Sequence, residues 1–372
     1  MKSVYVVSEN IISPLGFTTE ENFNSLKNNL SGIQPFKRSA LPNLFCASAI
    51  DKNVLSGRLN ELLKSYTFFE QLCILSISNA LEKIAFQINH HDTILILSTT
   101  KGNVELMRKD KPTDSRLYLH HSAKAILNYF QLTTEALVVS NACVSGVSAL
   151  NLAARLLQKN LYKNAIVCGA DVLSSFTLSG FESFKALSEE ACRPFDANRN
   201  GTSLGEGAAS IVLSNIEKSE IEILSGASSN DANHISGPSR SGDGLQIAIE
   251  KTLKLAENPK VDFISAHGTG TIYNDEMESK ALNLCSLQHL PVNSLKGYYG
   301  HTFGAAGIIE SVVSIESMRQ NMMIPTKGFE TACEAIQLNI PKSILHSQLD
   351  CCLKTASGFG GSNAAVVFVK RK

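Results

Sequence analysis

The sequence predicts an α/β protein with layered β-sheets and covering helices. Three observations lead to this fold class. Short apolar segments alternate along the chain with segments long enough to form helices. Several of the apolar segments are continuous aliphatic runs, which are typical of strands buried on both faces. Two kinds of segment in the first half of the chain also have counterparts in the second half, which indicates an internal duplication.

The expected strands are short and mostly aliphatic, and the expected helices carry apolar residues at helical spacing. We expect strands at residues 4–7, 93–97, 136–140, 165–168, 209–213, 221–224, 263–266 and 364–369. We expect helices at residues 19–29, 67–86, 146–159, 245–257, 275–287 and 304–319. In the helix at 146–159, for example, Val147, Leu150 and Ala154 are spaced so that they share one face.

The duplication is visible in two kinds of segment. GTSLGEGAASIVLSN and SGFGGSNAAVVFVK are each a glycine-rich loop followed by an aliphatic strand. VVSNACVSGVSALNLAARLL and VNSLKGYYGHTFGAAGIIESVV are each a strand, a sharp polar turn and a helix rich in small residues. We therefore expect two halves, residues 1–215 and 216–372, each of which contributes one such turn.

The composition fits a globular chain and excludes several classes of protein. The 372 residues contain 34 Lys+Arg against 34 Asp+Glu, so no net charge attracts nucleic acid or an anionic membrane. Hydrophobic residues make up 44% of the chain, too many for disorder, yet no apolar run reaches the roughly 18 residues of a spanning helix. The apolar start is interrupted by polar residues and predicts a strand rather than an export signal. We therefore expect a cytoplasmic protein with reduced cysteines.

Cys143 differs in context from the other cysteines. No C-x-x-C pair is present, which excludes a zinc ribbon and a thioredoxin motif. Cys143 follows the strand ALVVSNA and precedes a helix whose first turn is VSGV. The positive end of that helix would lower the pKa of the thiol and favour the thiolate. On this context alone, a catalytic nucleophile and a buried structural cysteine both stay open.

Two histidines occupy matching positions. His267 lies in FISAHGTGT at the end of a strand, and His301 lies in SLKGYYGHTFGAAG just before a helix. Small residues beside a polar one allow a ligand to approach the backbone closely. A site that joins both histidines to Cys143 is one interpretation, and two satisfied core histidines are the other. The adjacent histidine and cysteine pairs elsewhere predict no metal site, because neighbours on a strand point to opposite faces.

Five motifs together resemble one known family. ACVSG around Cys143, RPFDANRNGTSLGEGA (193–208), AHGTGTIYND (266–275), LKGYYGHTFGAAG (295–307) and SGFGGSN (357–363) are similar to motifs of the β-ketoacyl-[acyl-carrier-protein] synthases. They occur in the family's order and, with the opening VYVVSENIISPLG, extend the resemblance from residue 4 to residue 369. The resemblance implies the thiolase fold, with two duplicated α/β halves in five layers, α-β-α-β-α, and a protein that is normally dimeric.

The resemblance also implies roles for named residues. Cys143 would carry the acyl chain as a thioester. His267 and His301 would assist decarboxylation of malonyl-acyl carrier protein and stabilise the enolate oxygen. The backbone N–H groups of Cys143 and Phe359 would form the oxyanion hole. Lys296 would tune the charge of the site, and Glu310 would support that lysine and a histidine. Thr269 and Thr271 would form hydrogen bonds with the phosphopantetheine arm, and Phe181 and Phe359 would lie near the acyl pocket. Ser236 and Lys185 would lie at the entrance for the carrier protein.

The implied reaction is the decarboxylative Claisen condensation of an enzyme-bound acyl thioester with malonyl-acyl carrier protein, which gives β-ketoacyl-acyl carrier protein. One cysteine with two histidines indicates the elongating class, because thiolases have a second cysteine in place of His301 and the initiating synthases have His and Asn. The implied partner is acyl carrier protein, whose phosphopantetheine arm carries the substrates. No other cofactor, no metal and no nucleic acid is expected. A homodimer and a heterodimer with a related synthase-like subunit both stay open.

One segment departs from the family pattern. Between the strand ending at Ser98 and the strand beginning near Leu137, the chain is shorter than in housekeeping elongating synthases. LSTTKGN (97–103) also places Lys101 near the expected far wall of the acyl pocket. A lysine there either extends to solvent or changes which acyl chains the pocket accepts. The alternatives to fatty-acid elongation are therefore a specialised polyene or polyketide ketosynthase working with a second synthase-like subunit and, in a different class, a non-catalytic carrier-protein-binding partner subunit.

Overall fold

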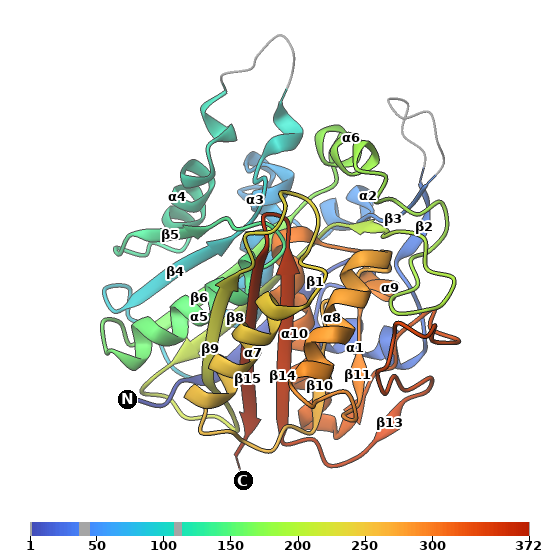
Figure 1. Ribbon diagram of the computed structural model, residues 1–372. Coiled ribbons are helices and arrows are strands. Elements are labelled where there is room, and N and C mark those ends of the chain that lie inside the picture. Colours follow the sequence, from blue (N-terminus) through green and yellow to red (C-terminus); the bar gives the residue numbers. More distant parts are fainter. Residues whose placement is uncertain (1, 37–44, 108–113, 372) are drawn as a thin grey trace.

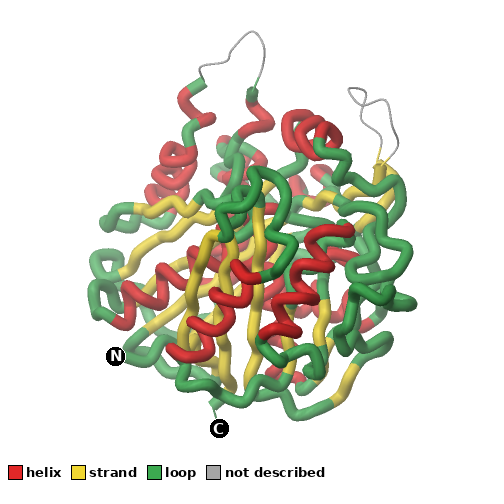
Figure 2. The backbone as a smooth tube through the Cα atoms, in the orientation of Figure 1, coloured by secondary structure: helices red, strands yellow, loops and turns green. Residues whose placement is uncertain are grey.

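The computed structural model describes residues 2–36, 45–107 and 114–371. Its central feature is a ten-stranded sheet in the order β11-β10-β14-β15-β9-β1-β8-β6-β4-β5 (Figure 1). The strands run through the middle of the molecule, and helices lie on both sides of them (Figure 2). This architecture confirms the predicted α/β class.

Two sets of five strands make up this sheet, one from each half of the chain. The first set is β1 (Tyr5–Ile12), β4 (Thr93–Ser98), β5 (Ala136–Val139), β6 (Asn164–Asp171) and β8 (Gly207–Ser214). The second set is β9 (Ile221–Asn230), β10 (Phe263–Ser265), β11 (Val292–Asn293), β14 (Cys351–Gly358) and β15 (Ser362–Lys370). The two sets meet where Tyr5 of β1 pairs with Glu222 of β9.

The two sets share one topology, which confirms the predicted duplication. In each set the strands are ordered first, fifth, fourth, second and third along the chain. In each, the second strand is parallel to the third and the fourth, and the fifth strand is antiparallel to the fourth and the first. The division at residues 215 and 216 falls between β8 and β9, and as a domain boundary it stays a prediction.

The larger helices form three layers around the two sets of strands. The middle layer consists of α5 (Ser145–Gln158) and α10 (Ala306–Gln320), which pack against strands of both sets. One outer layer, α3 (Phe68–Leu81) and α4 (Leu119–Tyr129), covers the first set of strands. The other outer layer, α7 (Asp243–Leu255) and α8 (Ile272–Leu284), covers the second set. One apolar core surrounds the middle helices, and two others lie under the outer helices. The layers therefore follow the expected order α-β-α-β-α.

The two middle helices touch through glycines. A Cβ atom on Gly146 would lie 2.9 Å from the backbone nitrogen of Ile308, and one on Gly307 would lie 2.7 Å from the backbone nitrogen of Val147. No side chain fits at such distances, so the small residues of VSGV and GAAG allow α5 and α10 to cross in backbone contact. Because both glycines lie in the first turns, the crossing brings the N-terminal ends of the two helices together.

Shorter elements complete the fold. They are α1 (Thr19–Lys27), α2 (Lys52–Ser56), α6 (Ser175–Ser183), α9 (Lys296–Tyr299), β2 (Ile33–Phe36), β3 (Phe45–Ser48), β7 (Leu204–Gly205), β12 (Met322–Met323), β13 (Leu345–His346) and the 3-10 turns η1 (Leu63–Ser65), η2 (Val104–Leu106), η3 (Ser115–Leu117) and η4 (Phe303–Ala305). β2, β3 and β7 form a separate sheet. Among the residues that the structure describes, no helix is both long and apolar enough to cross a membrane.

All expected strands and helices are present, but the sequence pattern does not predict every element. β1 and β9 are longer than expected, because each continues into residues that include serines and asparagines. β14, in the middle of the second set, escapes prediction because Lys354 interrupts its apolar run. α6 escapes it because only Thr177 and Leu178 of that helix are buried.

Candidate active site

Cys143 lies in a tight turn between β5 and α5. Ala142 has a φ of 43°, in the left-handed region that a residue with a side chain rarely adopts. The Ser145 hydroxyl fixes this turn, since it donates to the Ala142 carbonyl at 2.6 Å and accepts from the Asn141 N–H at 2.7 Å. Cys143 itself is only 7% exposed. The turn therefore presents one sulfur at the buried N-terminal end of α5.

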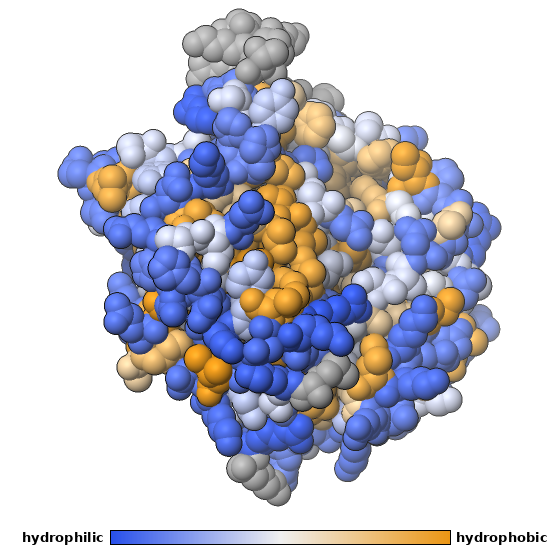
Figure 3. Space-filling model, turned by 90° about the vertical axis from the view of Figure 1, so that its left-hand side faces the viewer, coloured by the Kyte–Doolittle hydropathy of each residue, from blue (hydrophilic) through white to orange (hydrophobic). Residues whose placement is uncertain are grey.

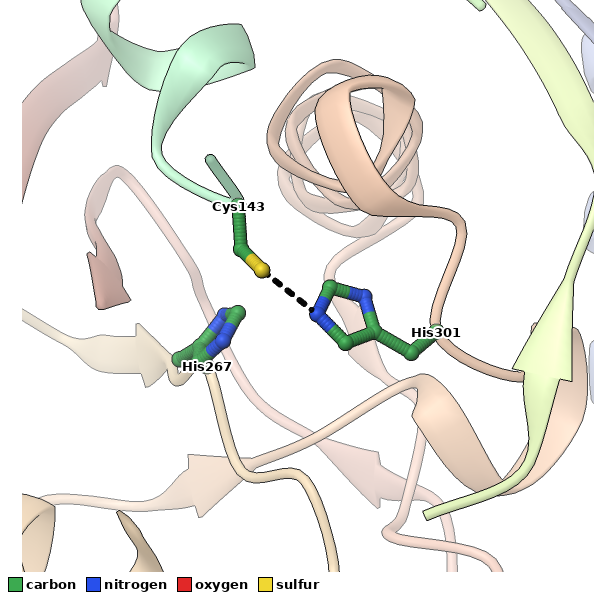
Figure 4. Close-up of side chains that lie close together, drawn as sticks. All are labelled: Cys143, His267 and His301. Carbon is green, nitrogen blue, oxygen red and sulfur yellow. Dashed lines mark hydrogen bonds between the residues drawn. The ribbon is translucent and has the colours of Figure 1, made fainter. Parts of the chain in front are cut away.

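The two histidines come from the second half of the chain and meet this sulfur. His267 follows β10, and His301 lies between α9 and η4. The His301 Nε2 atom lies 3.0 Å from the Cys143 Sγ atom, and the two imidazole centroids are 5.2 Å apart (Figure 4). One ligand atom from each of the three residues lies within 4.8 Å of the others. The structure thus brings together the three residues that the sequence singled out.

Hydrogen bonds to Nδ1 fix the tautomer of each histidine. The Phe303 N–H donates to His301 Nδ1 at 3.2 Å, so the ring proton of a neutral His301 sits on Nε2, which donates to Cys143. The Lys296 ammonium lies 3.3 Å from His267 Nδ1 and has no lone pair, so His267 also carries its proton on Nε2. The cluster therefore directs N–H groups into the site rather than the lone pairs that a metal would require.

Both histidines are held neutral. Burial lowers the pKa of His267 and that of His301 well below the usual value, and the positive charge of Lys296 lowers each pKa further. A neutral imidazole with Nε2–H is a hydrogen-bond donor at physiological pH. Two such donors in one buried site can stabilise an oxygen atom that gains negative charge.

The pKa of the Cys143 thiol differs from the sequence-based expectation. Burial raises this pKa to about 11, whereas the cations of Lys296 and Lys101 and a hydrogen bond from the Phe359 N–H act in the opposite direction. The expectation that the helix N-terminus lowers the pKa of the Cys143 thiol is therefore wrong, because desolvation of the thiolate is the larger effect.

Lys296 and Glu310 lie directly behind the histidines. The Lys296 Nζ atom is fully buried, donates to the His267 carbonyl at 2.5 Å and forms an ion pair with Glu310 Oε1 at 2.7 Å. The carboxylate balances the charge of the lysine, and the lysine in turn fixes His267. This contact agrees with the expected pairing of Lys296 with Glu310.

A cavity of about 440 Å³ leads to the sulfur. The expected site residues that line it are Cys143, Phe181, Lys185, Ser236, His267, Thr269, Thr271, His301 and Phe359. The Thr269 and Thr271 hydroxyls are 2.8 Å apart, and the Phe359 ring packs on Phe181 with centroids 5.5 Å apart. Lys185 is exposed at this cavity. The cavity is therefore lined by both polar groups and aromatic rings.

The backbone segments that carry the two amides of the expected oxyanion hole lie against each other. The Phe359 N–H is directed at the Cys143 sulfur. A Cβ atom on Gly358 would lie 3.0 Å from the backbone nitrogen of Cys143, which is tighter than an ordinary side-chain contact, so glycine favours this close approach of the two backbones.

Lys101 is not among the described residues that line the cavity. It is half-buried, and its Nζ atom has a single contact with the Thr100 carbonyl, at 3.4 Å, and no carboxylate at ion-pair distance among the described residues. Its charge nevertheless acts on Cys143. The effect of Lys101 on chain preference stays a prediction.

Sequence reasoning missed the buried acids that hold the site loops. Asp171, the last residue of β6, accepts hydrogen bonds from Thr99, Thr100 and the Lys101 N–H, and from the Gly304 N–H at 2.7 Å. Glu278 accepts the N–H groups of His267 and Gly268, and Asp275 accepts those of Thr269 and Gly270. An acidic residue at the end of an otherwise aliphatic strand was the available signal for Asp171.

Comparison with known proteins matches the whole chain. The family described as "Beta-ketoacyl synthase, N-terminal domain" matches residues 1–219, and "Beta-ketoacyl synthase, C-terminal domain" matches residues 221–330. The putative mitochondrial 3-oxoacyl-[acyl-carrier-protein] synthase of Schizosaccharomyces pombe is 28% identical, with 100% of this chain and 99% of the relative aligned. That alignment extends over 425 positions, more than the 372 residues of this chain, so the relative contains insertions.

Two further similarities concern polyketide proteins and the fold. The putative polyketide beta-ketoacyl synthase 1 of Streptomyces halstedii is 32% identical over 62% of this chain and 59% of the relative. The solved structure titled "The ishigamide ketosynthase/chain length factor" superimposes with a TM-score of 0.89 at 23% identity, covering 100% of both chains. This superposition confirms the expected fold.

Proposed function

This chain belongs to the β-ketoacyl synthase family, and we propose that it condenses an acyl thioester on Cys143 with malonyl-acyl carrier protein to give β-ketoacyl-acyl carrier protein. One observation carries the proposal: the Cys143 sulfur, a potential nucleophile, lies 3.0 Å from the His301 Nε2 atom, and His267 lies beside it in the wall of the same cavity. Acyl transfer and decarboxylation need these two kinds of group at one place.

Acyl loading is the first step of the proposed cycle. The Cys143 sulfur attacks the carbonyl carbon of the incoming thioester, and the bond from that carbon to the pantetheine sulfur breaks. The acyl group moves to Cys143, and the thiol proton passes to the departing pantetheine sulfur. The N–H groups of Cys143 and Phe359 would stabilise the oxyanion of the tetrahedral intermediate.

Decarboxylation and condensation follow. The malonyl thioester loses carbon dioxide, and the electron pair of the broken carbon–carbon bond forms an enolate. The Nε2–H groups of His267 and His301 would donate to the enolate oxygen, which gains charge in this step. The enolate carbon attacks the acyl carbon on Cys143, a new carbon–carbon bond forms, and the cysteine leaves as a thiolate that takes up a proton.

The same cavity suits the phosphopantetheine arm of a carrier protein. Thr269 and Thr271 offer hydroxyl groups inside it, and Ser236 and the exposed Lys185 lie where an acidic carrier or its phosphate would contact the protein. We propose that this arm, and no separate cofactor, presents the substrates.

A second synthase-like chain would cover the open edge of β5. Among the described residues, β5 pairs only with β4, and its four residues, ALVV, are all half-buried. Figure 3 shows an apolar area on the side of the molecule where β5 and α4 lie in Figure 1. Unpaired strand edges with apolar side chains favour pairing with another chain. We propose a dimer through this edge, with either a second copy or a related subunit.

The pathway has two candidates. General fatty-acid elongation agrees with the name of the S. pombe relative. A specialised polyene or polyketide chain agrees with the name of the S. halstedii relative, with the ketosynthase/chain length factor neighbour, and with the half-buried cation of Lys101 beside the site.

We also propose a cytoplasmic location. All nine cysteines are free, which suits a reducing compartment, and cell fractionation tests this location.

A reconstituted condensation assay tests the function. Wild-type protein with acyl-carrier and malonyl-carrier substrates is expected to form β-ketoacyl product, and Cys143→Ala is expected to lower the rate by about 10⁴-fold or more while thermal unfolding stays unchanged. Near wild-type product formation by Cys143→Ala would show that the nucleophile is misassigned. Failure of a cysteine-directed synthase inhibitor to label Cys143 would instead favour the non-catalytic partner subunit.

A further inference from the structure

Lys354 is a fully buried lysine in the middle of β14. Its Nζ atom lies 2.7 Å from Glu310 Oε2, 2.8 Å from the Thr355 carbonyl and 3.1 Å from the carbonyls of Ser265 and Ala266. An ammonium has three N–H bonds, so the three carbonyls can take the hydrogen bonds while Glu310 provides an ion pair. A lysine that is buried so completely needs this set of partners to remain charged.

Glu310 therefore serves two lysines. Its Oε1 atom pairs with Lys296 and its Oε2 atom pairs with Lys354, each at 2.7 Å. A second buried carboxylate, Glu278, accepts the His267 N–H at 2.8 Å and the Thr355 hydroxyl at 2.7 Å. Two lysines and two glutamates thus lie around the backbone of His267, and their charges sum to zero.

Lys354 also holds the end of β10, the strand that precedes His267. Ser265 and Ala266 directly precede that histidine, and both carbonyls accept hydrogen bonds from Lys354. Ser265 is the register partner of Lys354 in the parallel pair of β10 and β14. The lysine therefore ties the end of β10 to β14 at the point where the backbone turns toward the cavity.

The charge balance depends on Lys354. A neutral side chain at this position would leave Lys296 alone against Glu310 and Glu278, and this net negative charge would favour a protonated His267. The positive charge of Lys354 lowers the pKa of His267, after the larger effects of burial, Lys296 and His301. The charged and titratable groups around His267 are Lys296 on α9, Glu310 on α10, Lys354 on β14, Glu278 on α8, and His301 and Cys143 across the cavity.

We propose that Lys354 is a positioning residue for malonyl decarboxylation: it balances the second buried carboxylate and so keeps His267 neutral, with its Nε2–H directed at the enolate oxygen. The inference rests on the proposed function. Lys354 touches no substrate and acts only through His267 and the end of β10. Acyl loading onto Cys143 does not need this charge, so the two half-reactions respond differently to its loss.

The test is the pH profile of malonyl-acyl carrier protein decarboxylation, measured as acetyl-carrier formation. Wild type is expected to keep its rate on acidification to well below neutral pH. Protonation adds a proton at His267 Nδ1, which lies 3.3 Å from the Lys296 ammonium, so repulsion would displace the ring and turn its Nε2–H away from the enolate oxygen. The acid limb of this profile is the pH range in which the rate falls on acidification. In Lys354→Met the acid limb is expected to move toward neutral pH by about one unit, because removal of a nearby cation raises the pKa of His267. The double variant Lys354→Met/Glu310→Gln, which again has one lysine and one carboxylate, is expected to return the limb toward the wild-type position.

Two controls separate charge from structure. Lys370→Met removes a partly buried lysine at the far end of β15 and is expected to leave the profile unchanged. Lys354→Gln keeps N–H donors for the carbonyls but loses the charge, so it should show the same shift as Lys354→Met even if the latter variant folds poorly.

The outcomes distinguish this inference from the proposed function. A wild type that never decarboxylates the malonyl carrier would overturn the proposed function itself. A wild type that does so, together with unshifted profiles in Lys354→Met and Lys354→Gln, would overturn only the role of Lys354. A uniform loss of rate at all pH values, without a shift, would likewise show that the lysine is merely structural.

Discussion

The two halves of the chain repeat one strand order but hold their functional side chains differently. In the first half, the fourth strand of the set ends in Asp171, whose carboxylate accepts N–H groups from the loop after β4. In the second half, the fourth strand carries Lys354, whose ammonium donates to carbonyls at the end of β10. The equivalent strands β6 and β14 thus hold equivalent segments, the loop after β4 and the end of β10, through side chains of opposite charge.

The chemistry of the two halves differs in the same sense. The first half supplies a sulfur in a mostly uncharged turn, where burial raises the pKa of Cys143. The second half supplies two imidazoles backed by Lys296, Lys354 and Glu310. Under the proposed function, the first half would hold the acyl group and the second half would stabilise developing negative charge.

The largest expected effect separates these two tasks. His267→Ala and His301→Ala are each expected to lower malonyl decarboxylation by about 10²–10³-fold, because each removes one N–H donor to the enolate oxygen. Acyl loading should fall much less, since loading uses the N–H groups of Cys143 and Phe359. The two half-reactions can be measured separately as acetyl-carrier formation and as acylated protein. A variant that loads poorly yet decarboxylates normally would contradict this division of labour.

An intermediate effect concerns the pH dependence of Cys143. The thiolate is the reactive form, and a pKa of about 11 predicts that alkylation by iodoacetamide becomes about tenfold faster per pH unit between pH 7 and pH 9. Peptide mass analysis reports the modification of Cys143, and Cys143→Ala accounts for the other cysteines. A rate that levels off below pH 8 would show that the N–H donors and cations outweigh burial.

The smallest expected effect tests the cation beside the nucleophile. Lys101→Ile is expected to shift loading toward saturated octanoyl to palmitoyl chains, relative to unsaturated or aryl-capped chains, by a few-fold at most, because Lys101 does not line the cavity and acts on Cys143 only through its charge. Competition between the two kinds of acyl carrier on wild type and variant measures this ratio. Efficient elongation of saturated long chains by the wild type would instead favour general fatty-acid synthesis over the specialised pathway.

The sequence predicts the site better than the framework that supports it. Motifs placed Cys143, His267, His301 and Phe359 at turns after strands, and these turns converge in the structure. The sequence could not place Lys354, because a lysine within CCLKTASG resembles an exposed strand end until its partners from β10 and α10 are known. The tautomers depend on Phe303 and Lys296, and only the folded chain brings their donors to Nδ1.

The repeat shows the same limit at the level of the fold. The paired segments around Cys143 and His301 share their pattern of strand, turn and small-residue helix but little sequence. That pattern predicts the two turns, whereas the common strand order follows only from the pairings of β4 with β6 and of β10 with β14. Such pairings join segments far apart in the chain, which local spacing does not encode.

The most direct test of the division between the halves is intact-mass and peptide analysis of the acyl group on the protein. After incubation with an acyl carrier alone, we expect the mass of one acyl group on the peptide that contains Cys143, in wild type and in His267→Ala alike. On addition of malonyl-acyl carrier protein, wild type should lose this group as β-ketoacyl product, and His267→Ala should retain it. An acyl group on another cysteine, or condensation without any covalent acyl intermediate, would contradict the account.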